Sequence, residues 1–183
     1  MKVLLIDNGT TLLEKLKTLI PGEESIIRFD NLKDILTDSF DLVILSGGSA
    51  YYLVENEAKF SEELKFLRNT TKPVIGICFG FELIVKAFGG EIKKLENIDK
   101  GEKEIEILDN TLYKKPIIKV YESHGWGVQK LPENFDILAK SVVGPEIIKH
   151  KTQPIYGFQF HPENFVDELE GDEIFLQLFS NLA

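Results

Sequence analysis

Short apolar runs alternate with stretches of helical spacing along the first half of the chain, and this pattern constrains the fold more than any other feature. The runs cover residues 3–6, 26–29, 42–45 and 74–77, and helical spacing follows over 10–20, 32–36, 57–67 and 81–88. Continuous apolar runs are typical of strands that are buried on both faces. Strands that alternate with helices predict a mostly parallel sheet with helices on both faces.

The second half of the chain has a different texture. After Gly90, short runs of mixed polarity are separated by turn residues, and the clearest lie at 104–108, 117–120, 135–140, 146–149 and 155–160. Such runs are typical of antiparallel hairpins. A last helix is expected over 173–182. Because no repeat or linker interrupts the pattern, we predict one α/β domain over residues 1–183, with a mostly parallel, flavodoxin-like central sheet and antiparallel strands added in the second half.

Composition narrows the functional classes. The chain has a net charge of −9, from 21 Lys and Arg against 30 Asp and Glu. An acidic chain repels phosphate backbones, so we expect no nucleic-acid partner. No apolar run approaches the roughly 20 residues that cross a bilayer, so we expect no membrane association. The single cysteine, Cys78, excludes an internal disulfide and a Cys-rich zinc site. It indicates a reducing, cytoplasmic compartment, and we expect no metal or other cofactor.

Cys78 lies between a predicted buried strand and a predicted apolar helix, in the sequence Gly76-Ile77-Cys78-Phe79-Gly80. Flanking glycines permit the tight, strained turn that lifts a nucleophile above a sheet. The N-terminus of the following helix would favour the reactive thiolate. The backbone N–H of Phe79 would face a developing oxyanion. The alternative is a buried structural cysteine in a tight turn.

A nucleophilic cysteine needs a base, and the chain has three histidines. His161 follows the apolar run 156–160 and precedes Pro162, so we expect it at the end of a strand. Glu163 is close enough to fix the tautomer of the His161 imidazole and to orient its ring. The alternative is that His161 only caps the strand. His150 is expected near a strand end, in contact with solvent.

Four motifs occur in one order along nearly the whole chain, and together they resemble the class I (triad-type) glutamine amidotransferase domain. They are the loop Ser46-Gly47-Gly48, the Cys78 turn, the loop Ser123-His124-Gly125 and the segment 157–163. The resemblance implies that Cys78 is the nucleophile, that His161 is first base and then acid, and that Glu163 orients His161. It also implies an oxyanion hole made by the backbone of Gly48 and Phe79.

The resemblance implies in addition that the backbone around Ser123, Gly125 and Trp126 holds the amino-acid end of glutamine, and that His124 shapes this loop. Trp126 is equally consistent with ordinary packing. One position departs from the family pattern: Glu82 stands four residues after Cys78, where the family usually has a substrate-binding glutamine. We favour retained chemistry, with Glu82 protonated or turned toward solvent. Weakened activity, partner-dependent activity and a changed substrate are the alternatives.

The activity implied by the resemblance is hydrolysis of the glutamine side-chain amide through a cysteine thioester. No residues remain for a nucleotide-binding synthetase and no P-loop pattern is present, so we expect the ammonia to pass to a separate synthetase subunit. The segment 131–163 most resembles the stand-alone glutaminase subunits of GMP synthases, which suggests GMP synthesis. The alternatives are a hydrolase of another γ-glutamyl compound and a regulatory or binding subunit with weak catalysis.

Overall fold

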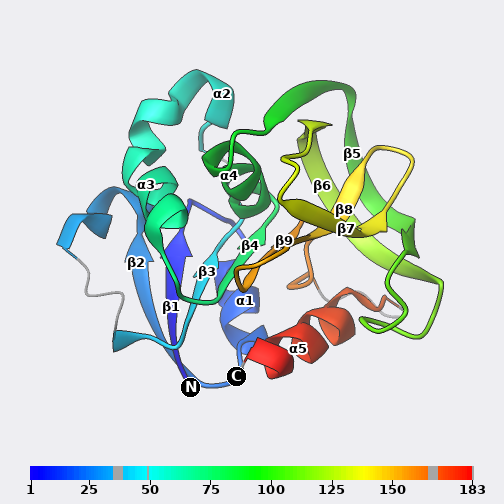
Figure 1. The fold of residues 1–183 in the computed structure, drawn as a ribbon, viewed down its shortest axis with the longest axis horizontal. Helices are drawn as coiled ribbons and strands as arrows, with labels where there is room; N and C mark the ends of the chain where they lie inside the picture. Colours follow the sequence, from blue (N-terminus) through cyan, green and yellow to red (C-terminus); the bar gives the residue numbers. More distant parts are fainter. Residues whose placement is uncertain (35–38, 49, 165–168, 183) are drawn as a thin grey trace.

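The computed structural model describes residues 1–34, 39–48, 50–164 and 169–182. The described strands form one sheet in the order β2-β1-β3-β4-β9-β8-β7-β5-β6 (Figure 1). In chain order the strands are β1 (Lys2–Asp7), β2 (Glu23–Arg28), β3 (Leu42–Leu45), β4 (Val74–Ile77), β5 (Glu91–Ile107), β6 (Ile117–Lys130), β7 (Phe135–Lys140), β8 (Pro145–His150) and β9 (Ile155–Phe158).

Half of the sheet is parallel. Strand β1 pairs in parallel with β2 and β3, β3 pairs with β4, and β4 pairs with β9. The predicted apolar runs at 3–6, 42–45 and 74–77 lie in β1, β3 and β4. The run at 26–29 ends one residue late, because Phe29 already begins a 3-10 helix over Phe29–Asp34. The α/β class is therefore confirmed, and the carboxyl ends of these strands meet at one edge of the sheet.

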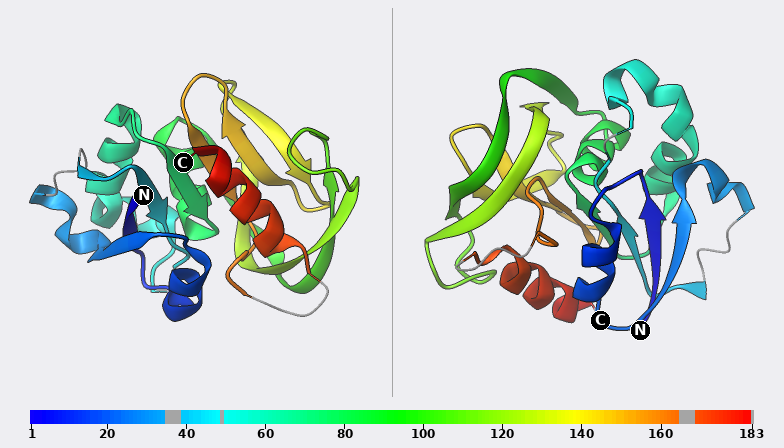
Figure 2. Two further views of the ribbon diagram at one scale, coloured as in Figure 1. Left: turned by 90° about the horizontal axis from the view of Figure 1, so that it is seen from below. Right: turned by 180° about the vertical axis from the view of Figure 1, so that it is seen from behind.

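Helices cover both faces of the parallel strands. Alternate residues of β1 point to opposite faces: Val3 and Leu5 pack with α1 (Leu13–Leu19) and α5 (Gly171–Leu182). Leu4 and Ile6 pack with the helices on the other face. These are α2 (Leu53–Asn56), α3 (Ser61–Asn69) and α4 (Phe79–Ala87). The view from behind shows α1 and α5 together on one face (Figure 2).

The antiparallel half comes from the second half of the chain, as predicted, but its first two strands, of 17 and 14 residues, are long rather than short. Strands β5 and β6 form a long hairpin, which continues through β7 and β8 to β9. This part of the sheet curls at the opposite end of the molecule from β2 (Figure 1). The hairpin carries residues 123–126 to the edge where the parallel strands end.

Three predicted helices differ from the observed ones. The first begins at Leu13 rather than at residue 10, because Asp7 Oδ1 accepts the N–H of Gly9 and of Thr10 and holds a loop there. The stretch predicted over 32–36 is a 3-10 helix as far as Asp34, and residues 35 and 36 lie outside the described residues. The stretch at 57–67 is a 3-10 turn (Glu57–Phe60) followed by α3. None of the helices in the described part of the chain is long and apolar enough to cross a membrane.

Candidate active site

The turn from β4 into α4 holds Cys78 in a strained conformation. Its φ of 50° is the only positive value among the described non-glycine residues, and such a backbone costs on the order of 1–3 kcal/mol. The two glycines of the motif serve close packing instead. A Cβ on Gly76 would lie 2.5 Å from the Gly80 carbonyl oxygen, and one on Gly80 would lie 2.4 Å from the Leu45 carbonyl oxygen. The predicted turn is present, with the strain on the cysteine itself.

His161 and Glu163 follow β9 and are both buried. The backbone N–H of His161 donates to the Tyr121 carbonyl oxygen at 2.9 Å. His161 Nδ1 lies 2.9 Å from Glu163 Oε1. This contact leaves Nε2 as the nitrogen that can exchange a proton with a nucleophile. The predicted pairing of the two side chains is present.

The pKa values of Cys78 and His161 are linked. Burial raises the pKa of the Cys78 thiol; His161 opposes this rise, while Glu82 and Glu163 add to it. The contribution of the helix N-terminus to the thiolate stays a prediction, and the cost of burying the charge works against it. Burial lowers the pKa of His161, but the Cys78 thiolate and Glu163 outweigh it and raise that pKa well above its ordinary value. The thiolate of Cys78 and the imidazolium of His161 therefore stabilise each other.

Two adjoining cavities open on Cys78 and share Gly48, Cys78 and Ser123 in their walls. The larger, of about 220 Å³, also has His161 in its wall. The smaller, of about 90 Å³, is bounded by Phe79, Glu82, His124, Gly125 and Trp126 among others. The fold therefore brings all four sequence motifs to one site.

The loop after β3 packs directly on the first turn of α4. A Cβ on Gly48 would lie 2.8 Å from the Asn8 carbonyl oxygen and 3.1 Å from Phe79 Cγ. A Cβ on Gly47 would lie 3.2 Å from His161 Cε1. Only a residue without a side chain lets the loop approach so closely. The backbone groups of Gly48 and Phe79 flank Cys78, and their role as an oxyanion hole stays a prediction.

The loop of residues 123–126 closes the site from β6. The Ser123 carbonyl oxygen lies 4.0 Å from Cys78 Sγ. His124 is buried, and its Nδ1 lies 2.6 Å from the Trp126 carbonyl oxygen. The Trp126 ring packs against Tyr52, with 5.9 Å between the ring centroids. His124 thus contacts the backbone of its own loop, as predicted for a residue that shapes it.

Glu82 is buried in the wall of the smaller cavity and is only 5% exposed. The alternative that it turns toward solvent is therefore wrong. Burial raises the pKa of Glu82 to about 8, and His124 partly opposes this rise. At neutral pH the side chain is mainly the uncharged acid, which donates one hydrogen bond and accepts others. A neutral Glu82 resembles the usual glutamine more closely than a carboxylate would.

His150 is buried, so the prediction that it contacts solvent was wrong. Its ring packs against Phe88 and Phe135 at the end of β8, with centroid separations of 5.0 and 4.9 Å. Its Nδ1 accepts the N–H of Gln153 at 3.0 Å. Burial lowers its pKa. The neutral ring caps the turn that follows β8. Because lysines flank His150 on both sides in the sequence, the local pattern indicated an exposed position.

Several residues around the site were not predicted from the sequence. Those in the larger cavity are Thr10, Thr11, Leu12, Lys100, Tyr121 and Asn164, and those in the smaller are Tyr51 and Tyr52. The threonines follow β1 in a polar loop, and that position at a strand end was an available clue. Lys100 and Tyr121 come from β5 and β6, and no local pattern places them near Cys78.

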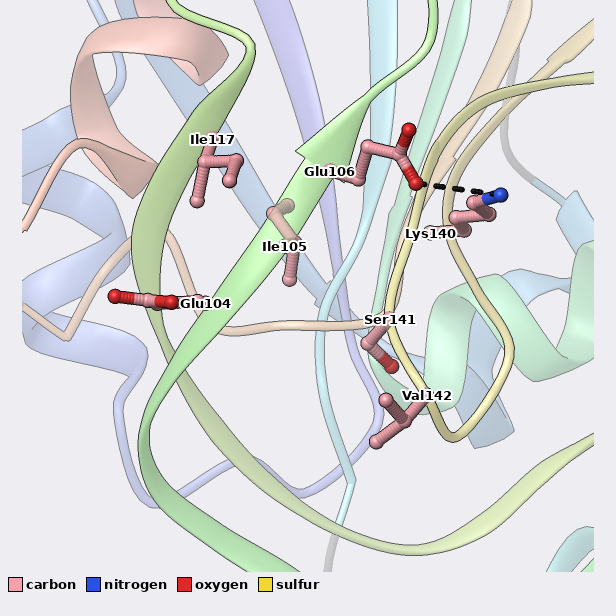
Figure 3. Close-up of a pocket in the computed structure, with 7 residues that line it drawn as sticks. All are labelled: Glu104, Ile105, Glu106, Ile117, Lys140, Ser141 and Val142. Atoms are coloured by element: carbon pink, nitrogen blue, oxygen red, sulfur yellow. Dashed lines mark ion pairs between the residues drawn. The ribbon is translucent and has the colours of Figure 1, made fainter.

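A separate hollow of about 300 Å³ lies on the antiparallel half of the sheet (Figure 3). It is lined by Glu104, Ile105, Glu106, Ile117, Lys140, Ser141 and Val142. Glu106 and Lys140 lie side by side at one end of it and form an ion pair at 3.2 Å. Its wall holds no cysteine or histidine among the described residues, whereas the larger cavity at Cys78 holds both the candidate nucleophile and the candidate base.

Comparison with known proteins agrees with this geometry. The family model described as glutamine amidotransferase class-I matches residues 4–181. One subunit of the glutamine-hydrolysing GMP synthase of Pyrococcus abyssi is 36% identical over 99% of this chain and 98% of that protein. The corresponding subunit from Methanothermobacter thermautotrophicus is 37% identical over 72% of this chain and 70% of its own.

A solved structure also resembles this one. It is a protein from Thermoplasma acidophilum assigned as a GMP synthase subunit, and it superposes with a TM-score of 0.87 at 26% identity, over 100% of this chain and 94% of that one. The family match covers nearly all of the chain, and the Pyrococcus abyssi relative covers it almost from end to end. The chain therefore belongs to the class-I glutamine amidotransferase family.

Proposed function

We propose that the chain hydrolyses the side-chain amide of glutamine through a thioester on Cys78 and supplies the ammonia to a separate synthetase subunit. One observation carries the proposal: the strained Cys78 shares a cavity with His161, whose Nδ1 is held 2.9 Å from the buried Glu163. Two relatives are named as subunits of glutamine-hydrolysing GMP synthases. Their names support both glutamine as the substrate and GMP synthesis as the pathway.

The first half of the reaction forms the thioester. Cys78 Sγ attacks the carbonyl carbon of the glutamine side chain, and the thiol proton passes to His161. The negative charge on the tetrahedral oxygen is stabilised by the backbone N–H groups of Gly48 and Phe79. His161 then donates its proton to the departing nitrogen. The C–N bond breaks, ammonia leaves, and a γ-glutamyl thioester remains on Cys78.

The second half regenerates the thiol. A water molecule attacks the thioester carbon while His161 accepts its proton. The C–S bond breaks, glutamate leaves, and the Cys78 thiolate takes the proton back from His161. Glu163 holds the imidazole in one tautomer throughout and stabilises its charged form. The net reaction converts glutamine and water into glutamate and ammonia.

Substrate selectivity depends on the smaller cavity. The backbone of Ser123, Gly125 and Trp126 holds the amino-acid end of glutamine, and Glu82 contacts the substrate as a neutral acid. A buried neutral acid offers no negative charge to a cationic γ-glutamyl amine. Glu82 therefore favours glutamine over that alternative substrate, and we assign residues 1–183 to one domain built around this site.

Glutamate release from glutamine by the purified chain tests the proposal. We expect turnover that increases when a candidate synthetase subunit is added, the synthetase of GMP synthase among them. A chain with Cys78→Ala should release no glutamate, and a glutamine-mimicking diazoketone should label only the unmodified chain. Turnover that is equal in both chains would refute the mechanism. A clear preference for a γ-glutamyl amine would refute the substrate, and no turnover with any partner would favour a binding subunit.

A further inference from the structure

Three ionisable side chains form a buried cluster behind the loop of residues 123–126. Glu122 and His124 extend from β6, and Glu146 extends from β8. Their exposed fractions are 1%, 4% and 1%. One oxygen or nitrogen atom of each lies within 4.8 Å of the other two. The proposed reaction leaves these three side chains without a chemical role, although burying them is unfavourable.

The orientation of His124 leaves one ring nitrogen facing a carboxylate. Its Nδ1 lies 2.6 Å from the Trp126 carbonyl oxygen, which can only accept a hydrogen bond, so the Nδ1 proton is donated there. In the neutral ring Nε2 then carries a lone pair. This Nε2 lies 3.2 Å from Glu122 Oε2. Two lone pairs at that distance repel each other, so either a proton or a metal cation lies between them.

The pairing of His124 has the form found around bound metals. A histidine that binds a metal through one nitrogen almost always donates the other N–H to a carboxylate, a backbone carbonyl or water. Two ligands of a tetrahedral zinc ion, at about 2.0–2.2 Å from the metal, are about 3.3–3.6 Å apart. The 3.2 Å between His124 Nε2 and Glu122 Oε2 is close to the lower end of that range.

Several atoms of the cluster have no hydrogen-bond partner among the described residues. They are both carboxylate oxygens of Glu122, Oε2 of Glu146 and Nε2 of His124. Glu146 Oε1 accepts the Ser141 hydroxyl at 2.6 Å, as expected of a carboxylate held in place for a ligand. Two adjacent buried carboxylates repel each other, and burial together with this repulsion raises the pKa of Glu146. A proton shared with Glu122 is therefore the competitor that a bound cation must displace. A divalent cation bound by both carboxylates and a neutral imidazole would give a site with no net charge.

A fourth buried polar side chain lies on the same side of the sheet as Glu146. Gln159 is 2% exposed, and neither atom of its side-chain amide has a hydrogen-bond partner among the described residues. Its backbone N–H donates to the Glu146 carbonyl oxygen at 2.9 Å, one residue beyond the last β8–β9 pair, Ile147 and Phe158. Directly opposite residues of antiparallel strands point to the same side of a sheet. The Gln159 amide therefore lies on the same side as the Glu146 carboxylate.

We propose that Glu122, His124 and Glu146 bind one divalent transition-metal cation of the zinc type. Imidazole and carboxylate ligands suit zinc and its neighbours in the first transition row. His124 also forms part of the wall of the smaller cavity, so the proposed site lies next to that cavity. The bound cation would link β6 to β8 through side chains on either side of Ser123 in the sequence.

Metal binding by the full chain tests this proposal. The chain is treated with a chelator, dialysed, and titrated with Zn²⁺ while bound metal is measured by mass spectrometry. We expect one Zn²⁺ per chain, a rise in Tm on addition of Zn²⁺, and a loss of affinity of roughly tenfold or more in Glu122→Gln and in Glu146→Gln. Glu63→Gln is the matched control, because Glu63 is equally buried but lies in α3, outside the cluster.

If the glutamine variants do not fold, the visible spectrum of Co²⁺ bound to the chain with all three ligands intact tests the proposal instead. Co²⁺ bound here should show the visible bands of nitrogen and oxygen ligation without a thiolate charge-transfer band, and Cys78→Ala should bind it equally well. A thiolate band, loss of binding in Cys78→Ala, or binding that Glu146→Gln leaves unchanged would overturn the proposal. So would the absence of stoichiometric binding, which would mean that protons alone hold the cluster together.

Discussion

Replacing Glu82 by glutamine should raise the free energy of unfolding at neutral pH by an amount that follows from the raised pKa of the buried Glu82. Burial raises the pKa of Glu82 from its ordinary 4.5 to about 8. The folded chain therefore binds this proton more tightly than the unfolded chain. The favourable contribution of this proton to the free energy of unfolding is complete below pH 4.5 and is lost as the pH rises to 8. Between pH 4.5 and pH 7 the loss is about 2.5 pH units at about 1.4 kcal/mol each, or about 3.5 kcal/mol, and Glu82→Gln removes it.

The same substitution should change the pH dependence of glutaminase activity. With a pKa of about 8, Glu82 is about 90% neutral at pH 7 and about 10% neutral at pH 9. The ionised form puts a negative charge beside Cys78 and further raises the pKa of the thiol. We expect kcat/KM of the parent chain to fall close to tenfold between pH 7 and pH 9 through this group, and Glu82→Gln to lack that decline.

Urea unfolding at pH 5, 7 and 9 and steady-state kinetics over the same range measure both effects. Glu63→Gln is the control, because burial raises the pKa of Glu63 also to about 8 and the residue does not line either cavity at Cys78. It should gain stability without any change in the pH profile of kcat/KM. The reasoning is refuted if Glu82→Gln loses stability at pH 7, or if its activity declines above pH 8 as steeply as that of the parent.

Other substitutions test the remaining parts of the account. Glu163→Gln should lower kcat by about 10²–10⁴-fold with little change in KM, because the imidazole loses its orienting charge; steady-state kinetics measure this. Gly80→Ala should lower the free energy of unfolding by about 1–3 kcal/mol in urea, because its Cβ would meet the Leu45 carbonyl oxygen. For His150, whose pKa burial lowers, the folded state favours the neutral ring, so stability should be lost as pH falls through 6.5. In urea unfolding, the His150→Gln chain should not lose stability over this pH range. A loss of stability in that chain larger than in the parent would contradict the buried position of His150.

The parallel half of the fold was predictable because its strands are buried on both faces. Leu42 to Leu45 is fully buried, and no polar residue interrupts the pattern. The antiparallel half was predictable only as a class. Strands β5 and β6 have one exposed face, so their sequences are of mixed polarity. Their exact pairing depends on contacts between distant residues, which local patterns do not specify.

The site shows the same division. The Cys78 turn and the pair His161 and Glu163 were predictable because motif spacing and strand ends place them. The position of His150 was not, because its burial depends on Phe88 from a different element. The cluster of Glu122, His124 and Glu146 was also missed, since β6 and β8 are not neighbours in the sheet. Their side chains meet only because the antiparallel half curls.

The most direct test of the central claim is to trap the covalent intermediate. The chain is mixed with glutamine, quenched in acid within a turnover, digested and analysed by mass spectrometry, in parallel with Cys78→Ala. The account predicts a γ-glutamyl adduct on the peptide that contains Cys78, formed and lost at rates that match glutamate release, and no adduct or glutamate from the variant. Glutamate release by the Cys78→Ala chain at the parent rate would contradict it.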